Sequence, residues 1–137
     1  MILGIGTDIV DIGRIDKLLA KNPERFIART FTQEEQDLAV KRAGGGLESA
    51  TYARRFAAKE ACAKALGSAI RDGILFTDFS ITNDEKGRPI LNLQGKARER
   101  LESLTPAGHN AHIHLSLSDE PPYALAYVII EARKVKS

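Results

Sequence analysis

Asp8 and Glu60 are carboxylates in sequence settings where an unpaired charge is unfavourable. Asp8 interrupts the apolar segment of residues 2–10, which also contains Gly4 and Gly6. A carboxylate in such a segment is costly to bury unless it is paired or bound to a cation. Asp8 therefore either caps the turn that follows a strand or belongs to a site that holds a positive charge.

Glu60 and Lys64 lie four residues apart in an alanine-rich segment, and Phe56 lies four residues before Glu60. On a helix these three side chains share one face. An exposed Glu–Lys pair at this spacing contributes only about 0.2–0.5 kcal/mol. The neighbouring alanines would let the helix pack closely and bury Glu60. A buried glutamate needs a partner, and a metal ion is one such partner.

His114, Ser116 and Ser118 occupy alternate positions within residues 111–118, so they share one face of a predicted strand. They form either the solvated face of an edge strand or a set of donors to a phosphate. No serine lies on a glycine-flanked elbow, which argues against a nucleophilic triad.

A row of basic residues recurs at steps of three or four positions: Arg14, Lys17, Lys21, Arg25 and Arg29. Such a row is either the solvated face of a helical region or a surface that docks an acidic partner, because basic clusters steer such partners.

These side chains must be positioned by elements that the apolar periodicity predicts. Asn22 and Pro23 end one helix and can start another, and Thr32 to Glu35 form a capping box. An antiparallel hairpin is expected around Pro121-Pro122. We expect strands at residues 2–10, 74–82, 89–93, 111–118 and 123–130, and helices at residues 13–21, 32–40, 47–66 and 95–104.

Length and composition fit one soluble domain, residues 1–137, which at this size needs no disulfide or metal to fold. Twenty Lys and Arg against 18 Asp and Glu leave a net charge of +2, too balanced for a general nucleic-acid binder. Cys62, the single cysteine, excludes an intrachain disulfide framework. The sequence has neither a membrane span nor a secretory signal, so we expect a cytoplasmic protein.

Two motifs carry a family resemblance: residues 4–10, Gly-Ile-Gly-Thr-Asp-Ile-Val, and residues 55–61, Arg-Phe-Ala-Ala-Lys-Glu-Ala, followed by Lys64. With them the sequence resembles the holo-acyl-carrier-protein synthases, the short, stand-alone class of 4′-phosphopantetheinyl transferases. Residues 87–89 and 114–118 also match in order and spacing, so the resemblance covers essentially the whole chain. It implies an α+β fold, with an antiparallel sheet packed against a long central helix and shorter helices. It also implies a homotrimer with active sites at subunit interfaces.

The resemblance implies a reaction as well. Enzymes of this family move the 4′-phosphopantetheine arm of coenzyme A onto a serine of an apo acyl carrier protein and release adenosine 3′,5′-bisphosphate. Mg²⁺ suits such a reaction, and Mn²⁺ remains an alternative because both ions favour carboxylate and water ligands. Asp8 and Glu60 match the metal ligands of the family, and Lys64 matches a residue that contacts phosphate. These three are the expected catalytic residues.

The remaining roles are implied by the same resemblance. Residues expected at the coenzyme are Arg55, Lys64, Gly87, Arg88, Pro89 and His114. Residues expected at the acidic carrier protein are Arg14, Arg25, Phe26 and Arg29. Asp119 stands where many relatives carry a histidine, and it receives no role; His109 and His112 receive none either.

Two other functions stay open at this point. One is a coenzyme A or nucleotide-binding module without transferase activity, and the other is a purely structural trimerisation or carrier-docking module. Metal-dependent release of the bisphosphate product separates the transferase from both.

Overall fold

The computed structural model describes residues 1–43, 48–71 and 73–136. Among these residues the chain forms a three-stranded antiparallel sheet in the order β1-β5-β4 and a separate antiparallel pair, β2-β3. The strands are β1 (Ile2–Asp11), β2 (Phe79–Asn83), β3 (Pro89–Leu93), β4 (His109–Glu120) and β5 (Tyr123–Lys134). The helices are α1 (Ile12–Lys21), α2 (Pro23–Thr30), α3 (Gln33–Ala43), α4 (Glu48–Ala65) and α5 (Gly95–Leu104).

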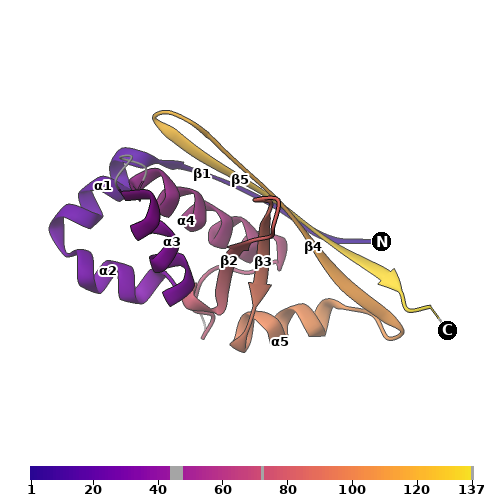
Figure 1. Ribbon diagram of the computed structural model, residues 1–137. Helices are drawn as coiled ribbons and strands as arrows, with labels where there is room; N and C mark the ends of the chain where they lie inside the picture. The colour runs from indigo at the N-terminus through magenta and orange to yellow at the C-terminus, as the bar shows by residue number, and fades with distance from the viewer. Residues whose placement is uncertain (44–47, 72, 137) are drawn as a thin grey trace.

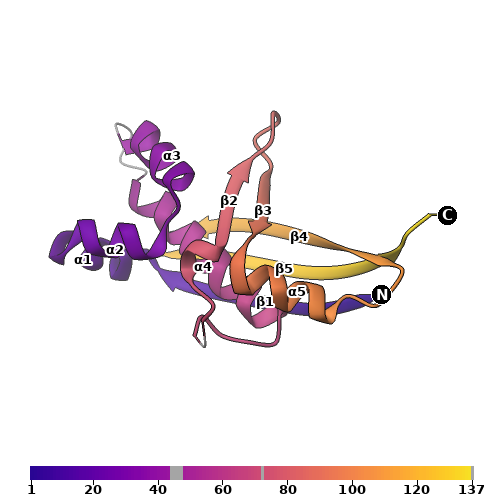
Figure 2. The same cartoon turned by 90° about the horizontal axis from the view of Figure 1, so that it is seen from below.

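Helix α4 lies along one face of the three-stranded sheet (Figure 1) and is buried over most of its length. Helices α1, α2 and α3 gather at one end of α4, and α5 lies at the other end. The β2–β3 hairpin projects away from the larger sheet (Figure 2). None of the described helices combines the length and the apolar character needed to cross a membrane.

Among the described residues the predicted elements are confirmed with two differences; residue 47, the predicted start of the long helix, lies outside the described residues. Within residues 74–82 the chain first makes a 3₁₀ turn at Phe76–Asp78, and only β2 is a strand. The turn forms because the Asp78 carboxylate accepts hydrogen bonds from the backbone N–H groups of Leu75 and Ala97, at 3.2 and 3.4 Å. Strands β4 and β5 are longer than predicted, since they pair with each other from end to end.

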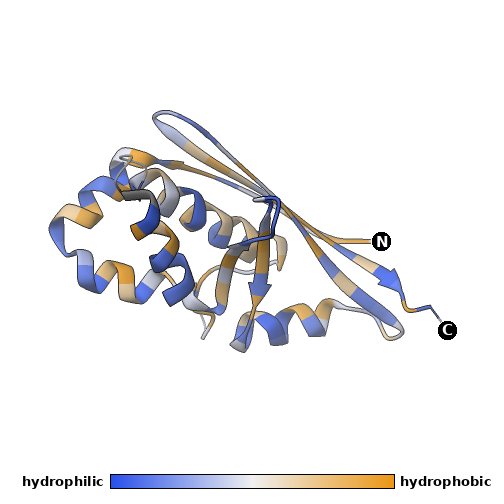
Figure 3. Ribbon diagram, viewed as in Figure 1, coloured by the Kyte–Doolittle hydropathy of each residue, from blue (hydrophilic) through white to orange (hydrophobic). Residues whose placement is uncertain are grey.

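Strand β1 meets α4 through glycine. A Cβ atom on Gly4 would overlap the backbone carbonyl of Ala65, and one on Gly6 would overlap the carbonyl of Ala61. The two backbones are therefore in direct contact, which only residues without a side chain permit at these positions. β1 is predominantly hydrophobic in Figure 3.

A buried ion pair ties the helices at one end of the molecule to α4. Lys59 has a side chain with 0% exposure, and its Nζ lies 2.6 Å from Oε1 of Glu35. The same Nζ donates to the backbone carbonyls of Thr30, Phe76 and Phe79, at 2.8–3.1 Å. Glu35 also accepts from the backbone N–H of Thr32, as the predicted capping box requires, and from that of Ile81.

The face of the sheet opposite α4 is exposed and rich in apolar side chains. Ile5 and Ile9 of β1 are 64% and 60% exposed, and Tyr127 and Ile129 of β5 are also open to solvent. A connected apolar face of this kind is typical of an interaction surface rather than of a free protein surface.

Candidate active site

Asp8, Glu60 and Lys64 meet where β1 crosses α4. Asp8 shares a strand face with Gly4 and Gly6 because the side chains of a strand alternate, so it points toward the helix. Nζ of Lys64 donates to Oδ1 of Asp8 at 3.1 Å and to the backbone carbonyl of Thr7 at 3.0 Å. The structure therefore brings together residues that are more than fifty positions apart in the sequence.

The environment of Glu60 makes its charged form less favourable than that of a carboxyl in water. Burial raises the pKa of the Glu60 carboxyl above its ordinary value, and the negative charge of Asp8 raises it further. Lys64 and Arg14 act in the opposite direction but do not cancel these effects. A bound cation would offset both effects. Its positive charge would replace the hydration that Glu60 loses on burial and would neutralise the repulsion between Glu60 and Asp8.

The chemistry of these donors fits a hard divalent cation. Asp8 and Glu60 supply carboxylate oxygens, the ligands that Mg²⁺ and Mn²⁺ prefer. Within the described part of the chain, no group of three or more His, Cys, Asp and Glu side chains is placed to hold a metal. Two carboxylates would leave coordination positions for water and for substrate phosphate, as is usual for Mg²⁺ at phosphate-binding sites.

Arg14 adjoins this cluster from α1. Its guanidinium carbon lies 5.6 Å from the centroid of the Phe56 ring, a cation–π geometry. Phe56 lies one helical turn before Glu60, so Arg14 stands at the edge of the carboxylate cluster. The predicted partner residue and the predicted metal ligands are therefore neighbours.

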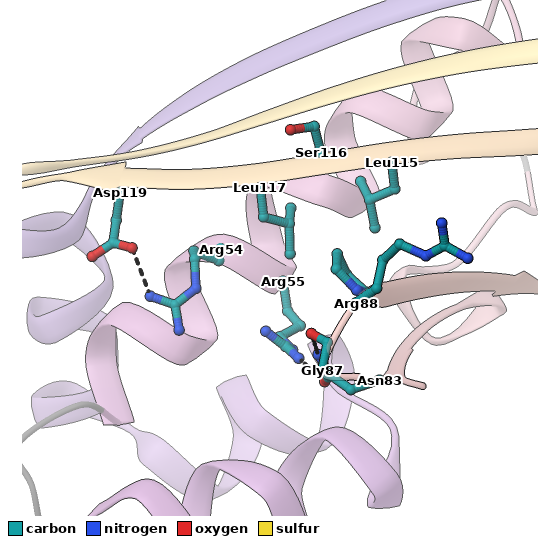
Figure 4. A pocket seen from close by; sticks show the side chains of 10 residues that line it. Arg54, Arg55, Asn83, Gly87, Arg88, Leu115, Ser116, Leu117 and Asp119 are labelled. Atoms are coloured by element: carbon teal, nitrogen blue, oxygen red, sulfur yellow. Dashed lines mark hydrogen bonds and ion pairs between the residues drawn. The ribbon is translucent and has the colours of Figure 1, made fainter. Parts of the chain in front are cut away.

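A cavity of about 410 Å³ lies nearer the N-terminus of α4 than Glu60 does. It is enclosed by this helix, the β2–β3 turn and β4 (Figure 4). Of the residues expected at the coenzyme, the cavity gathers Arg55, Gly87, Arg88 and Pro89. Arg55 is buried, and its Nη2 donates to Oδ1 of Asn83 at 2.8 Å. Nδ2 of Asn83 in turn donates to the carbonyl of Gly87 at 2.9 Å, so Asn83 links the arginine to the turn.

Asn83 and Arg54 line the cavity without having been predicted from the sequence. A polar residue at the end of a strand before a turn is the available signal for Asn83, but it is shared by many turns. Nη1 of Arg54 lies 3.0 Å from Oδ1 of Asp119, so the residue to which the resemblance gave no role is paired with an arginine.

His114 lies apart from the carboxylate cluster. It shares a cavity of about 390 Å³ with Arg88 and Pro89, which the resemblance also places at the coenzyme. Its Nε2 lies 3.0 Å from Oε1 of Glu131, to which Nη2 of Arg133 also lies at 3.0 Å. His114 pairs in register with Ile129 on the exposed sheet face, whereas Asp8 faces α4. One chain therefore does not bring His114 to the carboxylates.

Arg25, Phe26 and Arg29 line a small groove of about 110 Å³, together with Leu18, Lys21 and Asn22. The basic row of the sequence is divided between two helices, because Asn22 caps α2 by accepting from the backbone N–H of Arg25. The Phe26 ring lies 6.5 Å from that of Phe56. The groove thus reaches the aromatic side chain that also supports Arg14.

An antiparallel sheet on one long helix, with two carboxylates and a lysine where they cross, has the features of an enzyme that transfers a phosphate-linked group. The chain belongs to the 4′-phosphopantetheinyl transferase superfamily, whose model matches residues 4–128. It is 53% identical to the holo-[acyl-carrier-protein] synthase of Cereibacter sphaeroides, over 97% of this chain and 95% of that protein. It is also 53% identical to the synthase of Methylorubrum extorquens, over 96% and 95% of the two chains.

Solved structures confirm the expected α+β fold. The synthase of Neisseria meningitidis superposes with a TM-score of 0.80 at 38% identity, covering 96% of this chain and 99% of that one. The synthase of Bacillus anthracis, solved in complex with CoA (3′,5′-ADP), gives a TM-score of 0.75 at 35% identity, covering 95% and 96%.

Proposed function

We propose that the protein transfers the 4′-phosphopantetheine group of coenzyme A to a serine of an apo acyl carrier protein. The products are the holo-carrier and adenosine 3′,5′-bisphosphate. Relatives of 53% identity over nearly the whole chain are holo-[acyl-carrier-protein] synthases, which supports this reaction. The observation that carries the proposal is the convergence of Asp8, Glu60 and Lys64 at the contact of β1 with α4.

Asp8 and Glu60 are the proposed ligands of Mg²⁺, with Mn²⁺ as an alternative. The bound cation would supply neutralisation of the negative charge on the diphosphate of coenzyme A. Glu60 is suited to this role because its carboxylate is under-solvated and faces a second carboxylate. The Lys64 side chain is 53% exposed, so its ion pair with Asp8 is weak. Lys64 can therefore leave Asp8 and bind a phosphate oxygen instead.

The transfer itself is a displacement at phosphorus. The serine oxygen of the carrier forms a bond to the β-phosphorus, and the bond from that phosphorus to the bridging oxygen breaks. The α-phosphate leaves as the 5′-phosphate of the bisphosphate, and the serine proton passes to water. Lys64 and Arg55 would hold the phosphates, while residues 87–89 and His114 would border the rest of the coenzyme. Holding the reactants in line is a large part of catalysis in such transfers.

A homotrimer would complete this site. In one chain, His114 lies on the exposed sheet face and the carboxylates lie on the face against α4. The exposed apolar face, with Ile5, Ile9 and Tyr127, needs a covering surface. Cyclic assembly through this face is the proposed way in which residues of neighbouring chains meet. Sedimentation that gives a fully active monomer would contradict it.

The carrier protein is proposed to dock along α1 and α2. Arg14 is next to the carboxylates, and Arg25, Phe26 and Arg29 extend the surface away from them. This combination of guanidinium groups with an aromatic side chain suits an acidic helical partner. The serine of a carrier bound here would lie close to Asp8 and Glu60.

Residues 1–137 are proposed to act as one transferase domain, since β1 pairs with β5 from nearly opposite ends of the sequence. A cytoplasmic location is also proposed. The buried free thiol of Cys62 is compatible with a reducing compartment.

Intact-mass spectrometry of an apo acyl carrier protein tests the function. The carrier is incubated with the protein, coenzyme A and Mg²⁺, and a gain of one phosphopantetheine group is expected. The gain should disappear with EDTA and with Glu60→Gln, and should persist with the matched surface variant Glu102→Gln. A module that only binds coenzyme A would leave the carrier mass unchanged under every condition.

A further inference from the structure

The β2–β3 hairpin carries the turn at residues 87–89, but in the described part of the chain its two strands form a sheet of their own. The hairpin stands away from the larger sheet in Figure 2. A two-stranded hairpin by itself is only marginally stable in water, so contacts from other elements must hold it in place. These contacts decide where the turn lies relative to α4.

Glu35 of α3 binds β2 directly. The Glu35 side chain is 0% exposed, and its Oε2 accepts a hydrogen bond from the backbone N–H of Ile81 at 3.0 Å. Its Oε1 lies 2.6 Å from Nζ of Lys59, so α4 holds the same carboxylate from another direction. A backbone N–H group of the hairpin is thereby satisfied by a buried charged side chain of a helix, and such charge-assisted hydrogen bonds are the stronger ones.

Two further contacts fix the neighbouring residues of β2. Nζ of Lys59 donates to the backbone carbonyl of Phe79 at 2.8 Å, and Oγ1 of Thr32 lies 3.1 Å from Oγ of Ser80. With the bond to Ile81, three successive residues of β2 are attached to α3 and α4. The base of the hairpin is therefore set by side chains that lie outside the hairpin.

The attached segment leads directly to the residues proposed at the coenzyme. Asn83 ends β2 two residues after Ile81, and its Oδ1 accepts a hydrogen bond from Nη2 of Arg55 at 2.8 Å. Nδ2 of Asn83 donates to the carbonyl of Gly87 at 2.9 Å. A shift of β2 at Ile81 would therefore move both the partner of Arg55 and the turn. A displacement of about 1 Å caused far from the ligand is enough to weaken a positioned site strongly.

We propose that Glu35 is a positioning residue for coenzyme binding, which holds β2 through Ile81 and so fixes the turn at residues 87–89 without touching the coenzyme. The inference rests on the proposed use of coenzyme A. A purely structural role of Glu35 predicts lower stability alone. A positioning role predicts in addition a selective loss of affinity for coenzyme A.

Glu35→Asp tests this role, because it keeps the charge that Lys59 requires and shortens the side chain by one methylene group. The shorter carboxylate should not reach Lys59 and Ile81 together. Calorimetric titration with coenzyme A, at fixed Mg²⁺ and ionic strength, should show about tenfold weaker binding. The apparent KM for the carrier should stay within about twofold, since Glu35 contacts none of the residues proposed at the carrier.

Two measurements separate positioning from general destabilisation. Hydrogen exchange of the Ile81 amide should accelerate more in Glu35→Asp than exchange of the Val128 amide, which lies in β5. Leu104→Ala, at a partly buried position of α5, is the control for lost stability. It should leave the affinity for coenzyme A within about twofold at a temperature where both variants are folded.

Ser80→Ala provides a milder variant that removes no charge. It deletes the contact with Thr32, and we expect about threefold weaker binding of coenzyme A, the size of one ordinary hydrogen bond. Thr105→Val is its matched control, because it removes a hydroxyl group that donates to the carbonyl of Leu101 within α5 at 2.7 Å. If Glu35→Asp does not fold, this pair of variants decides the question.

Unchanged affinity for coenzyme A in Glu35→Asp would overturn the inference, whether or not the Ile81 amide exchanges faster. Equal losses in Leu104→Ala, or equal changes for coenzyme and carrier, would also overturn it. The mass-spectrometric assay on the unmodified protein tests the proposed function separately. Normal transfer combined with full coenzyme affinity in Glu35→Asp refutes this inference alone, whereas an unmodified protein that neither binds coenzyme A nor transfers refutes the proposed function.

Discussion

Lys59 and Glu60 are adjacent on α4, yet their charges are accommodated in opposite ways. Lys59 is fully buried and has four oxygen atoms within hydrogen-bond distance, one of them from the Glu35 carboxylate. Glu60 faces another carboxylate, and burial together with that charge raises its pKa. The first charge is matched by the fold, whereas the second is left for a ligand to match. Of two adjacent residues on one helix, Lys59 therefore stabilises the fold and Glu60 is available for ligand binding.

The largest effect is expected from breaking the matched pair. Lys59→Met leaves Glu35 as a buried carboxylate without its cation, and such losses cost about 3–5 kcal/mol. Urea unfolding at neutral pH and fixed protein concentration measures this change. The double variant Lys59→Met with Glu35→Gln should recover part of the loss, because no buried charge remains. A single variant within about 1 kcal/mol of the unmodified protein, the typical effect of any point substitution, would contradict the importance of the pair.

The next largest effect is expected at the contact between Gly6 of β1 and the backbone of α4, which positions Asp8. Gly6→Ala places a Cβ atom against the backbone of α4, where no flexible side chain can move aside. Overpacking of this kind costs about 1–3 kcal/mol, and we expect β1 to shift away from the helix. Transfer activity should fall by more than stability explains. Gly108→Ala is a comparison variant outside the proposed site: an added Cβ atom meets no other atom within 4 Å there, although its φ of +76° adds backbone strain. Full activity in Gly6→Ala would show that the contact does not set the site geometry.

A smaller effect of the opposite sign is expected for the unmatched charge. A folded-state pKa of Glu60 above its ordinary value of 4.5 means that the folded protein binds the proton more tightly than the unfolded chain. The stability associated with that proton is present below pH 4.5 and is lost as the pH rises through the folded-state pKa. Glu60→Gln should therefore be more stable than the unmodified protein at pH 7, by no more than about 0.5 kcal/mol because solvent screens a half-buried carboxyl.

Thermal unfolding at a series of pH values measures the stability difference between Glu60→Gln and the unmodified protein. Repeating the measurement with Mg²⁺ tests whether Glu60 binds the cation. The cation should raise the melting temperature of the unmodified protein by mass action and should have little effect on Glu60→Gln. The difference between the two proteins should shrink as the pH falls below 4.5, because the protonated form of Glu60 is then favoured in both states. Equal stabilisation of both by Mg²⁺ would place the ion elsewhere.

The smallest predicted effect lies at the edge of the carboxylate cluster. Arg14→Ala should raise the apparent KM for the carrier about fivefold and leave that for coenzyme A nearly unchanged, because charges at an interface rim act mainly on association. Arg98→Ala, on the exposed surface of α5, is the matched control for the loss of one arginine. Arg14 also lowers the pKa of Glu60, so its removal should move the acidic limb of the pH–rate profile to higher pH. Equal changes in both KM values would contradict a role in carrier binding.

Sequence reasoning found the features that depend on local spacing. The helical spacing of Glu60 and Lys64 placed them on one face, and Lys64 does lie at the same crossing as Asp8 and Glu60. The capping box at Thr32 was also found, because both of its members lie within one turn. What was missed depends on distant contacts. Glu35 serves the cap and Lys59 together, and no local pattern indicates that second partner, 24 residues away.

Two other differences have the same origin. The 3₁₀ turn before β2 depends on Asp78 binding the start of α5, across nineteen positions of sequence. The separation of His114 from Asp8 depends on which face of the sheet each residue occupies, which follows from the register of β4, β5 and β1. The motif order of the family gave no information about that register within a single chain.

The contact of Gly4 and Gly6 with α4 also limits how this enzyme could be redesigned. Elsewhere in a protein core, a designer can alter the spacing of two elements by exchanging large and small side chains. Between β1 and α4 there are no side-chain atoms at these positions to exchange. The spacing of the two backbones is already at its minimum, so a site for a smaller ion cannot be made by bringing them closer. A preference for larger ions would have to come from longer or shorter ligands at positions 8 and 60, with both backbones left in place.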